Sequence, residues 1–222
     1  DAVVRMSNAA QETFARFSPN PLRSCMIQGC LEKGRDYKWG GPLYGHGQVL
    51  AEGIADTADA LYAVKTLVFE QKKYTMDEMI TALEDNFEGH DALWQDCKNA
   101  PKFGNDIPDV DNLCAAIVDH FFAYLKTKNT FRGGVFTGGC SPFSRAANNG
   151  RATGALPNGR HSGDATFADS VAAVPGCDVK GPTAALKSMM CYNQTEACSG
   201  FVTQMKFDKK LFASDKGIET FI

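Results

Sequence analysis

The chain has 222 residues, of which 44% are hydrophobic and 22% are charged, and its formal net charge is −3 at pH 7. This is the composition of a globular protein with a sizeable core. A charge so close to neutral argues against nucleic acid or a membrane surface as the main partner. No apolar run approaches the ~18 residues of a membrane-spanning helix. No secretory signal pattern is visible, so we expect a cytoplasmic protein.

The eight cysteines favour free thiols over a disulfide framework. No Cys-x-x-Cys pair occurs, and the chain is too long for a small disulfide-stapled scaffold. The cysteine and histidine spacings also differ from the short paired spacings of zinc sites, so we expect no bound metal. A cysteine nucleophile with a histidine base stays open, because such partners meet only in the fold. The candidate bases are His46, His90 and His161.

Residues 1–128 are predicted to be mainly helical with one strand. The short apolar run at 25–30 predicts that strand, and a glycine-rich turn follows it at 40–47. A capping box of Thr75 and Glu78 marks the start of one helix. The helices predicted from apolar spacing span 1–17, 48–71, 75–87, 92–97 and 108–128.

Residues 129–222 are predicted to be loop-rich with strands. Glycine, serine, asparagine and proline are frequent up to Pro182, and long loops of this kind often line a functional site or a subunit surface. Strands are predicted over 131–137 and 201–207, and a short helix over 183–190. Because the chain mixes helices with strands and shows no internal repeat, we expect an α/β fold.

Glu32 is the best single candidate for chemistry from the residues alone. It follows the predicted strand at a glycine-punctuated turn, where α/β enzymes often place functional groups. There it could accept a proton or orient a substrate hydroxyl. The alternative is a carboxylate that binds backbone N–H groups of the turn. The turn at 40–47 could instead hold a phosphate, although it matches neither the P-loop nor the dinucleotide-binding motif.

A set of short sequence blocks follows one order along nearly the whole chain. Each block is common alone, but the ordered set resembles the C-terminal half of the catalytic chain of glycyl radical enzymes, the pyruvate formate-lyase-like group. Choline trimethylamine-lyase, glycerol and hydroxyproline dehydratases, and 4-hydroxyphenylacetate decarboxylase are the members that it resembles most. The blocks are Gly-Cys-Leu-Glu-Lys-Gly-Arg-Asp at 29–36, residues 55–70, Asn-Phe-Glu-Gly at 86–89, Asn-Ala-Pro-Lys-Phe-Gly-Asn-Asp at 99–106, Arg-Gly-Gly at 132–134, Pro-Asn-Gly-Arg at 157–160 and Gly-Pro-Thr-Ala at 181–184.

The resemblance implies a fold and a chemistry that the residues alone do not. The fold would be a ten-stranded α/β barrel, with residues 1–222 as part of a single barrel domain. The activity would be a lyase, dehydratase or decarboxylase that cleaves a C–C, C–O or C–N bond of a small polar or aryl-acid substrate through a cysteine thiyl radical. No cofactor would be bound here, since a separate S-adenosylmethionine/iron–sulfur activase installs the glycyl radical. The full-length protein would be a homo-oligomer.

The resemblance also implies site residues. Glu32 resembles a glutamate that faces the substrate hydroxyl in a related decarboxylase, and Ser141 and Phe143 fall where relatives line the substrate cavity. Cys30 lies in the second of two such motifs, so the thiyl cysteine is expected upstream. The glycyl-radical motif Arg-Val-x-Gly-Tyr does not occur in these residues. We therefore expect a fragment that is inactive alone. The alternative is a non-catalytic docking module derived from the same fold.

One further block departs from the family. Relatives read approximately Pro-Leu-(Ala/Ser)-Asp-Gly where this chain has Thr-Phe-Ala-Asp-Ser at 166–170. We therefore expect a local difference in this loop.

Overall fold

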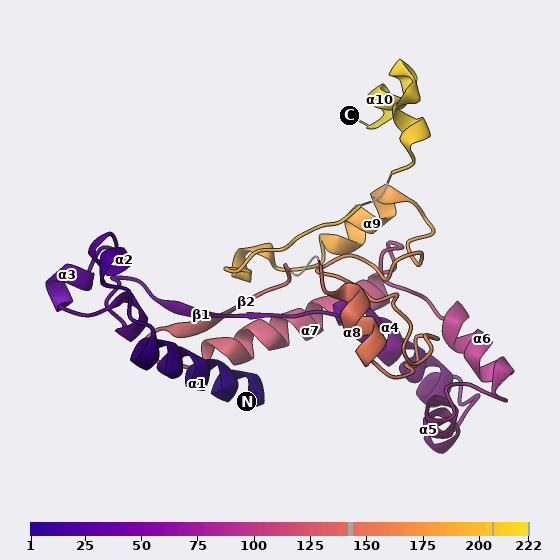
Figure 1. Ribbon diagram of the computed structural model, residues 1–222. Coiled ribbons are helices and arrows are strands. Elements are labelled where there is room, and N and C mark those ends of the chain that lie inside the picture. The colour runs from indigo at the N-terminus through magenta and orange to yellow at the C-terminus, as the bar shows by residue number, and fades with distance from the viewer. Residues whose placement is uncertain (142–143, 206, 222) are drawn as a thin grey trace.

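The computed structural model describes residues 1–141, 144–205 and 207–221 and has a mixed α/β architecture (Figure 1). Within these residues the strands are β1 (His46–Leu50) and β2 (Val135–Gly139). The helices are α1 (Ala2–Phe17), α2 (Pro21–Cys25), α3 (Cys30–Lys33), α4 (Ile54–Val64), α5 (Met76–Glu84), α6 (Asp91–Asn99), α7 (Pro108–Lys126), α8 (Ala146–Ala152), α9 (Pro182–Met189) and α10 (Asp215–Phe221). A π-helical stretch (Lys65–Glu70) extends α4. None of the described helices is long and apolar enough to cross a membrane.

β1 and β2 form a parallel sheet in which His46 pairs with Val135 and Leu50 with Gly139. Parallel strands need a crossover connection, which here contains α4 to α7. Figure 1 shows α7 running beside the two strands. We call the side that α7 covers the closed face. Phe136 on this face is completely buried, which fixes the orientation of the sheet.

Residues 199–202, the edge segment, continue the sheet alongside the end of β2. The Ser199 amide donates to the Gly138 carbonyl at 3.1 Å, and the Cys140 amide donates to the Gly200 carbonyl at 2.9 Å. The edge segment therefore runs parallel to β2 beyond the strand's regular end.

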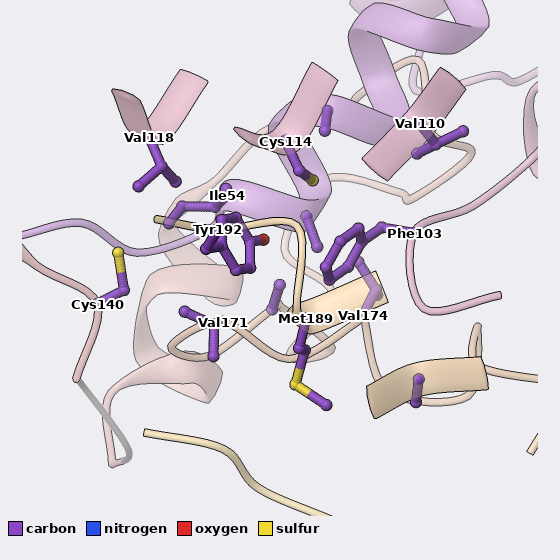
Figure 2. Close-up of a cluster of buried hydrophobic side chains, with 14 of the residues drawn as sticks. Ile54, Phe103, Val110, Cys114, Val118, Cys140, Val171, Val174, Met189 and Tyr192 are labelled. Atoms are coloured by element: carbon purple, nitrogen blue, oxygen red, sulfur yellow. The ribbon is translucent and has the colours of Figure 1, made fainter. Parts of the chain in front are cut away.

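The main hydrophobic core lies where α4 and α7 meet α9 and the loop that precedes it (Figure 2). Its buried side chains include Ile54 from α4, Cys114 and Val118 from α7, and Tyr192 from the segment after α9. A smaller cluster around Met79 joins α5 and α6 to the end of α4. The long helices thus hold the two strands from one side only.

Most of the predicted helices are confirmed. The predictions over 1–17, 92–97, 108–128 and 183–190 correspond to α1, α6, α7 and α9. The capping box that begins α5 is complete, because the Glu78 amide donates to Thr75 Oγ1 at 3.2 Å and the Glu78 carboxylate accepts from the Thr75 amide at 2.7 Å. Helix α8 was not predicted.

The strand predicted over 25–30 is wrong, since α2, a turn and α3 occupy this stretch. Asn20 caps α2 by accepting from the Arg23 amide at 3.0 Å, with Pro21 in the first turn. Gly29 then takes φ +94°, a left-handed value that glycine adopts freely. An apolar run this short did not outweigh the capping and turn signals on either side of it.

The start of the helix predicted over 48–71 is also wrong, because β1 ends at Leu50 and α4 begins only at Ile54. Gly53 at φ +69° separates them. β1 is difficult to predict because glycine occupies one of its positions. A Cβ at Gly47 would lie 2.6 Å from the Phe136 ring, so the close packing leaves no room for the larger side chains that are typical of strands.

The two predicted C-terminal strands need correction as well. The strand predicted over 131–137 begins only at Val135, because residues before it form a turn closed by the Thr130 amide and the Gly134 carbonyl at 2.7 Å. The strand predicted over 201–207 is reduced, in the described residues, to the single bridge of Phe201 with Cys140.

Candidate functional site

Among the described residues, no helix covers the side of the sheet opposite α7 (Figure 1), and we call this side the open face. Directly paired residues of parallel strands share a face, and successive residues alternate. The register therefore places His46, Gln48 and Leu50 of β1 beside Val135 and Thr137 of β2 on this face. All of them except the half-buried Thr137 are exposed. Polar side chains in the middle of a parallel sheet are unusual, because such sheets are normally apolar on both faces.

A row of three hydroxyl groups crosses the carboxyl end of the open face. Thr137 Oγ1 donates to the Gly47 carbonyl at 3.2 Å and lies 3.3 Å from Ser199 Oγ of the edge segment. Ser141 Oγ donates to the Ser199 carbonyl at 3.2 Å. We call Thr137, Ser199 and Ser141 the hydroxyl row. Hydroxyls can both donate and accept, so the row can bind either kind of polar group on a ligand.

The loop before α9 crosses the carboxyl ends of the strands. It is tied to them through the Gly53 amide, which donates to the Ala168 carbonyl at 3.2 Å. Glu52 lies here, and burial raises the pKa of its carboxyl, with Arg145 opposing and Asp169 adding to the effect. The loop therefore lies at the same end of the strands as the hydroxyl row. This carboxyl end is where α/β sheets bind their ligands.

Glu32 does not lie at the end of a strand. It lies in α3, exposed to solvent, before the turn that leads into the amino end of β1. The carboxylate that organises the turn is Asp36, which accepts from the Asn20 amide at 2.8 Å, the Lys38 amide at 2.9 Å and Ser24 Oγ at 2.8 Å. These bonds lower the pKa of Asp36 against the opposing effect of burial. The structure thus gives Asp36 the turn-binding role that was the alternative for Glu32, and leaves Glu32 free of it.

The other expected site residues have different positions. Ser141 belongs to the hydroxyl row, whereas Phe143 lies outside the described residues. Cys30 is buried, and burial together with the nearby Asp36 raises the pKa of its thiol. This environment suits a packing residue rather than a thiolate nucleophile. Sequence reasoning missed Gln48, Thr137 and Ser199. No strand was predicted at Gln48 or Ser199, and the strand predicted over 131–137 gave no reason to single out Thr137.

The glycine-rich turn does not precede a helix, so the alternative of a phosphate site at a helix N-terminus is wrong. The turn leads into β1 instead. A hollow of about 320 Å³ does lie beside it, lined by Lys33, Tyr37, His46 and Arg132 among others. No group of three His, Cys, Asp or Glu side chains suited to a metal occurs in the described part of the chain.

Several of the ordered sequence blocks meet at two buried carboxylates of α4. Asp56 accepts from Asn158 Nδ2 at 2.9 Å and from the Ala168 amide at 2.6 Å. Asp59, one turn later, accepts from the Phe103 amide at 2.7 Å. These blocks therefore anchor loops to α4, away from the open face.

Arg160 closes the same group of loops. Its guanidinium is buried and donates to the carbonyls of Gly150 at 2.7 Å and Asp164 at 2.6 Å. The Pro-Asn-Gly-Arg block thus acts as a structural anchor at the end of α8.

The chain is similar to several known proteins. Residues 1–150 match the pyruvate formate lyase-like family model. Trans-4-hydroxy-L-proline dehydratase of Clostridioides difficile is 31% identical over 96% of this chain and 27% of its own length. Indoleacetate decarboxylase of Tractidigestivibacter scatoligenes is 28% identical over 92% of this chain and 26% of its own length.

A solved structure shows the same arrangement of elements. The glycerol-bound B12-independent glycerol dehydratase of Clostridium butyricum superposes with a TM-score of 0.91 at 35% identity, over 96% of this chain and 27% of that chain. The chain therefore spans about a quarter of the length of these relatives. The match extends through the elements that carry the open face, and the chain belongs to the pyruvate formate lyase-like family of glycyl radical enzymes.

Proposed function

We propose that residues 1–222 form part of the α/β barrel of a glycyl radical lyase, and that the open face lines its substrate cavity. The observation that carries the proposal is the two-sided sheet: α7 covers the apolar closed face, while His46, Gln48 and Thr137 place polar groups on the other face beside two exposed apolar side chains. In a closed barrel the helix-covered face lies outside and the other face points inward. The ten-stranded barrel would need strands supplied by the remaining length of the protein.

The chain's own residues would bind and orient the substrate. Gln48 and the hydroxyl row can hydrogen-bond polar groups of a small substrate, and so can the imidazole of His46. The radical chemistry would come from other segments. There, a cysteine thiyl takes a hydrogen atom from a substrate carbon, an adjacent C–O, C–N or C–C bond breaks, and the product radical takes the hydrogen atom back.

The partners in this proposal are those that the family implies. A separate activase would install the glycyl radical using S-adenosylmethionine and an iron–sulfur cluster, and the full-length enzyme would be a homo-oligomer in the cytoplasm. The relatives' names indicate a small substrate, either hydroxylated, as with trans-4-hydroxy-L-proline and glycerol, or an aryl acid, as with indoleacetate. The hydroxyl row favours the hydroxylated class, and so a dehydratase.

The loop-rich region gives less support to the alternative of a docking module. Its central part is tied inward by Asn158 and Ala168 to the buried Asp56 carboxylate. A surface organised for a partner would instead present this region outward.

Anaerobic activation of the full-length protein tests the proposal, with trans-4-hydroxy-L-proline, glycerol and indoleacetate as substrates. We expect turnover of a hydroxylated compound. On that compound, Gln48→Ala and Thr137→Val should each lower kcat/KM about tenfold, the size expected for the loss of one hydrogen bond to substrate. Gln71→Ala, an exposed change beyond α4, is the matched control.

Two results would overturn the proposal. The first is wild-type kcat/KM in both open-face variants. The second is a full reading frame without a Gly-Cys-x-Glu loop upstream or an Arg-Val-x-Gly-Tyr motif downstream. Glu32→Gln belongs in the same series: full turnover in this variant would remove Glu32 from the catalytic residues while leaving the open face in place.

A further inference from the structure

Ser170 combines a strained backbone with complete burial. Its φ is +55°, and its side chain is fully inaccessible to solvent. A residue with a Cβ is strained in this left-handed region, because its Cβ comes too close to the following carbonyl oxygen. Glycine would avoid that strain. The serine hydroxyl must therefore offset the strain.

The hydroxyl of Ser170 joins the end of β2 to the edge segment. Its oxygen accepts from the Val202 amide at 3.0 Å. Its single hydrogen lies within reach of the carbonyl oxygens of Cys140 and Val202. Because Cys140 directly follows β2 and Val202 belongs to the edge segment, this one side chain links the two extended segments.

The edge segment in turn places one member of the hydroxyl row. Ser199 is held against β2 by its amide, which donates to the Gly138 carbonyl at 3.1 Å. In that position its Oγ lies 3.3 Å from Thr137 Oγ1, and its carbonyl accepts from Ser141. A shift of the edge segment along β2 would move Ser199 away from Thr137 and Ser141.

We propose that Ser170 is a positioning residue that holds the edge segment in register with β2 and so places Ser199 in the substrate-facing hydroxyl row. The inference rests on the proposed function of the open face. Ser199 is then a further specificity-determining residue, which recognises a hydroxyl or another hydrogen-bonding group on a small polar substrate. Ser170 acts through Ser199 and does not touch the substrate.

The test uses the full-length activated enzyme with trans-4-hydroxy-L-proline or glycerol, whichever it converts, and compares Ser170→Ala, Ser170→Gly and Ser199→Ala. We expect each to raise KM about fivefold to tenfold, with kcat changed less than twofold. Ser170→Ala keeps the strain and removes the hydroxyl, whereas Ser170→Gly removes both. An equal KM in these two variants would show that the hydroxyl, not the strain, positions Ser199.

Hydrogen exchange supplies a readout that does not depend on activity. In the Ser170 variants, amides of the edge segment should exchange at least tenfold faster, while those of α7 stay unchanged. Ser188→Ala is the matched control, because Ser188 is also fully buried and its hydroxyl accepts from the Asp106 amide at 2.9 Å, away from the open face. This control should lower stability without changing KM or exchange in the edge segment.

The outcomes separate the two proposals. If Thr137→Val raises KM but Ser170→Ala and Ser199→Ala do not, the open face stands and the positioning role is wrong. If none of the three changes kcat/KM and Gln48→Ala leaves it unchanged as well, the open face itself is not the substrate surface. Unchanged exchange of the edge segment in Ser170→Ala would overturn the positioning role whatever the kinetics.

Discussion

Asp59 carries a buried carboxylate with only one of its oxygens hydrogen-bonded. Its Oδ1 accepts from the Phe103 amide, while Oδ2 has no partner among the described residues. Burial raises the pKa of Asp59 from 3.8 to about 7, with the Phe103 amide and Lys102 opposing and Asp56 and Asp111 adding to the effect. Between these two pKa values, the folded state thus keeps a proton on the Asp59 carboxyl, whereas the unfolded chain has released it.

This pKa sets the sign of a pH dependence. Between pH 4 and pH 7 the folded state binds more protons than the unfolded state, so stability falls as pH rises through that window and levels off above it. The two pKa values correspond to on the order of 4 kcal/mol. Asp59→Asn keeps an oxygen for the Phe103 amide and removes the charge. We therefore expect the variant to gain stability over wild type as the pH rises from 5 to 8.

Urea unfolding of the full-length protein at pH 5 and pH 8 measures this difference. Asp119→Asn, an exposed change on α7, is the control. Its stability relative to wild type should be the same at both pH values. An Asp59→Asn variant whose advantage over wild type is constant or shrinks from pH 5 to pH 8 would contradict the assignment.

Single residues also show the limit of prediction from sequence. Glu32 and Cys30 carry side chains that are typical of catalytic sites, yet Glu32 lies exposed on α3 and Cys30 is buried. Thr137 and Ser199 gave no signal, because hydroxyl residues are common in loops. Their hydroxyls lie 3.3 Å apart only through the pairing of segments 62 residues apart, which no local pattern encodes.

At the scale of elements, most helices were predictable, whereas the strands were predicted only in part. The apolar spacing of α7 and the capping box of α5 are local signals, so their sequence suffices. β1 and β2 depend on contacts across the crossover instead. Gly47 and Gly138 are required because the rings of Phe136 and Phe122 occupy the space beside them. In the sequence alone, where these packing partners are not visible, such glycines indicate a turn.

The packing of α7 on the sheet leads to a prediction at Gly138. A Cβ there would lie 2.2 Å from the Phe122 ring and 3.0 Å from Phe121. Gly138→Ala should therefore lower stability by about 1–3 kcal/mol, the usual range for overpacking a closed core. The double variant Gly138→Ala/Phe122→Leu should recover part of that loss, because the smaller side chain vacates the space.

Thermal unfolding of the full-length protein measures these variants. Gly45→Ala is the matched control, because a Cβ at Gly45 meets nothing within 4 Å. If Gly138→Ala is as stable as Gly45→Ala, the assignment of the closed face, and with it that of the open face, is wrong.

At the scale of the whole molecule, the chain holds a sheet with unpaired edges. β1 pairs only with β2 in the described residues, and the edge segment makes a single bridge. Small sheets of this kind are marginally stable in water, and open edges invite pairing with other strands. The chain covers about 27% of relatives whose solved structure superposes on it, so the missing neighbours are expected in the rest of the protein.

This incompleteness predicts different behaviour for the separate chain and the full-length protein. Residues 1–222 alone should give no product with the activase, because the expected radical-bearing residues lie elsewhere. Amides of β1 should exchange at least a hundredfold faster in the separate chain, since their outer edge lacks a partner. Amides in the core of α7, where Cys114 and Val118 are buried, serve as the internal control and should be protected in both. Equal protection of β1 in the two samples would mean that the sheet is complete without further strands, and the barrel proposal would then fail.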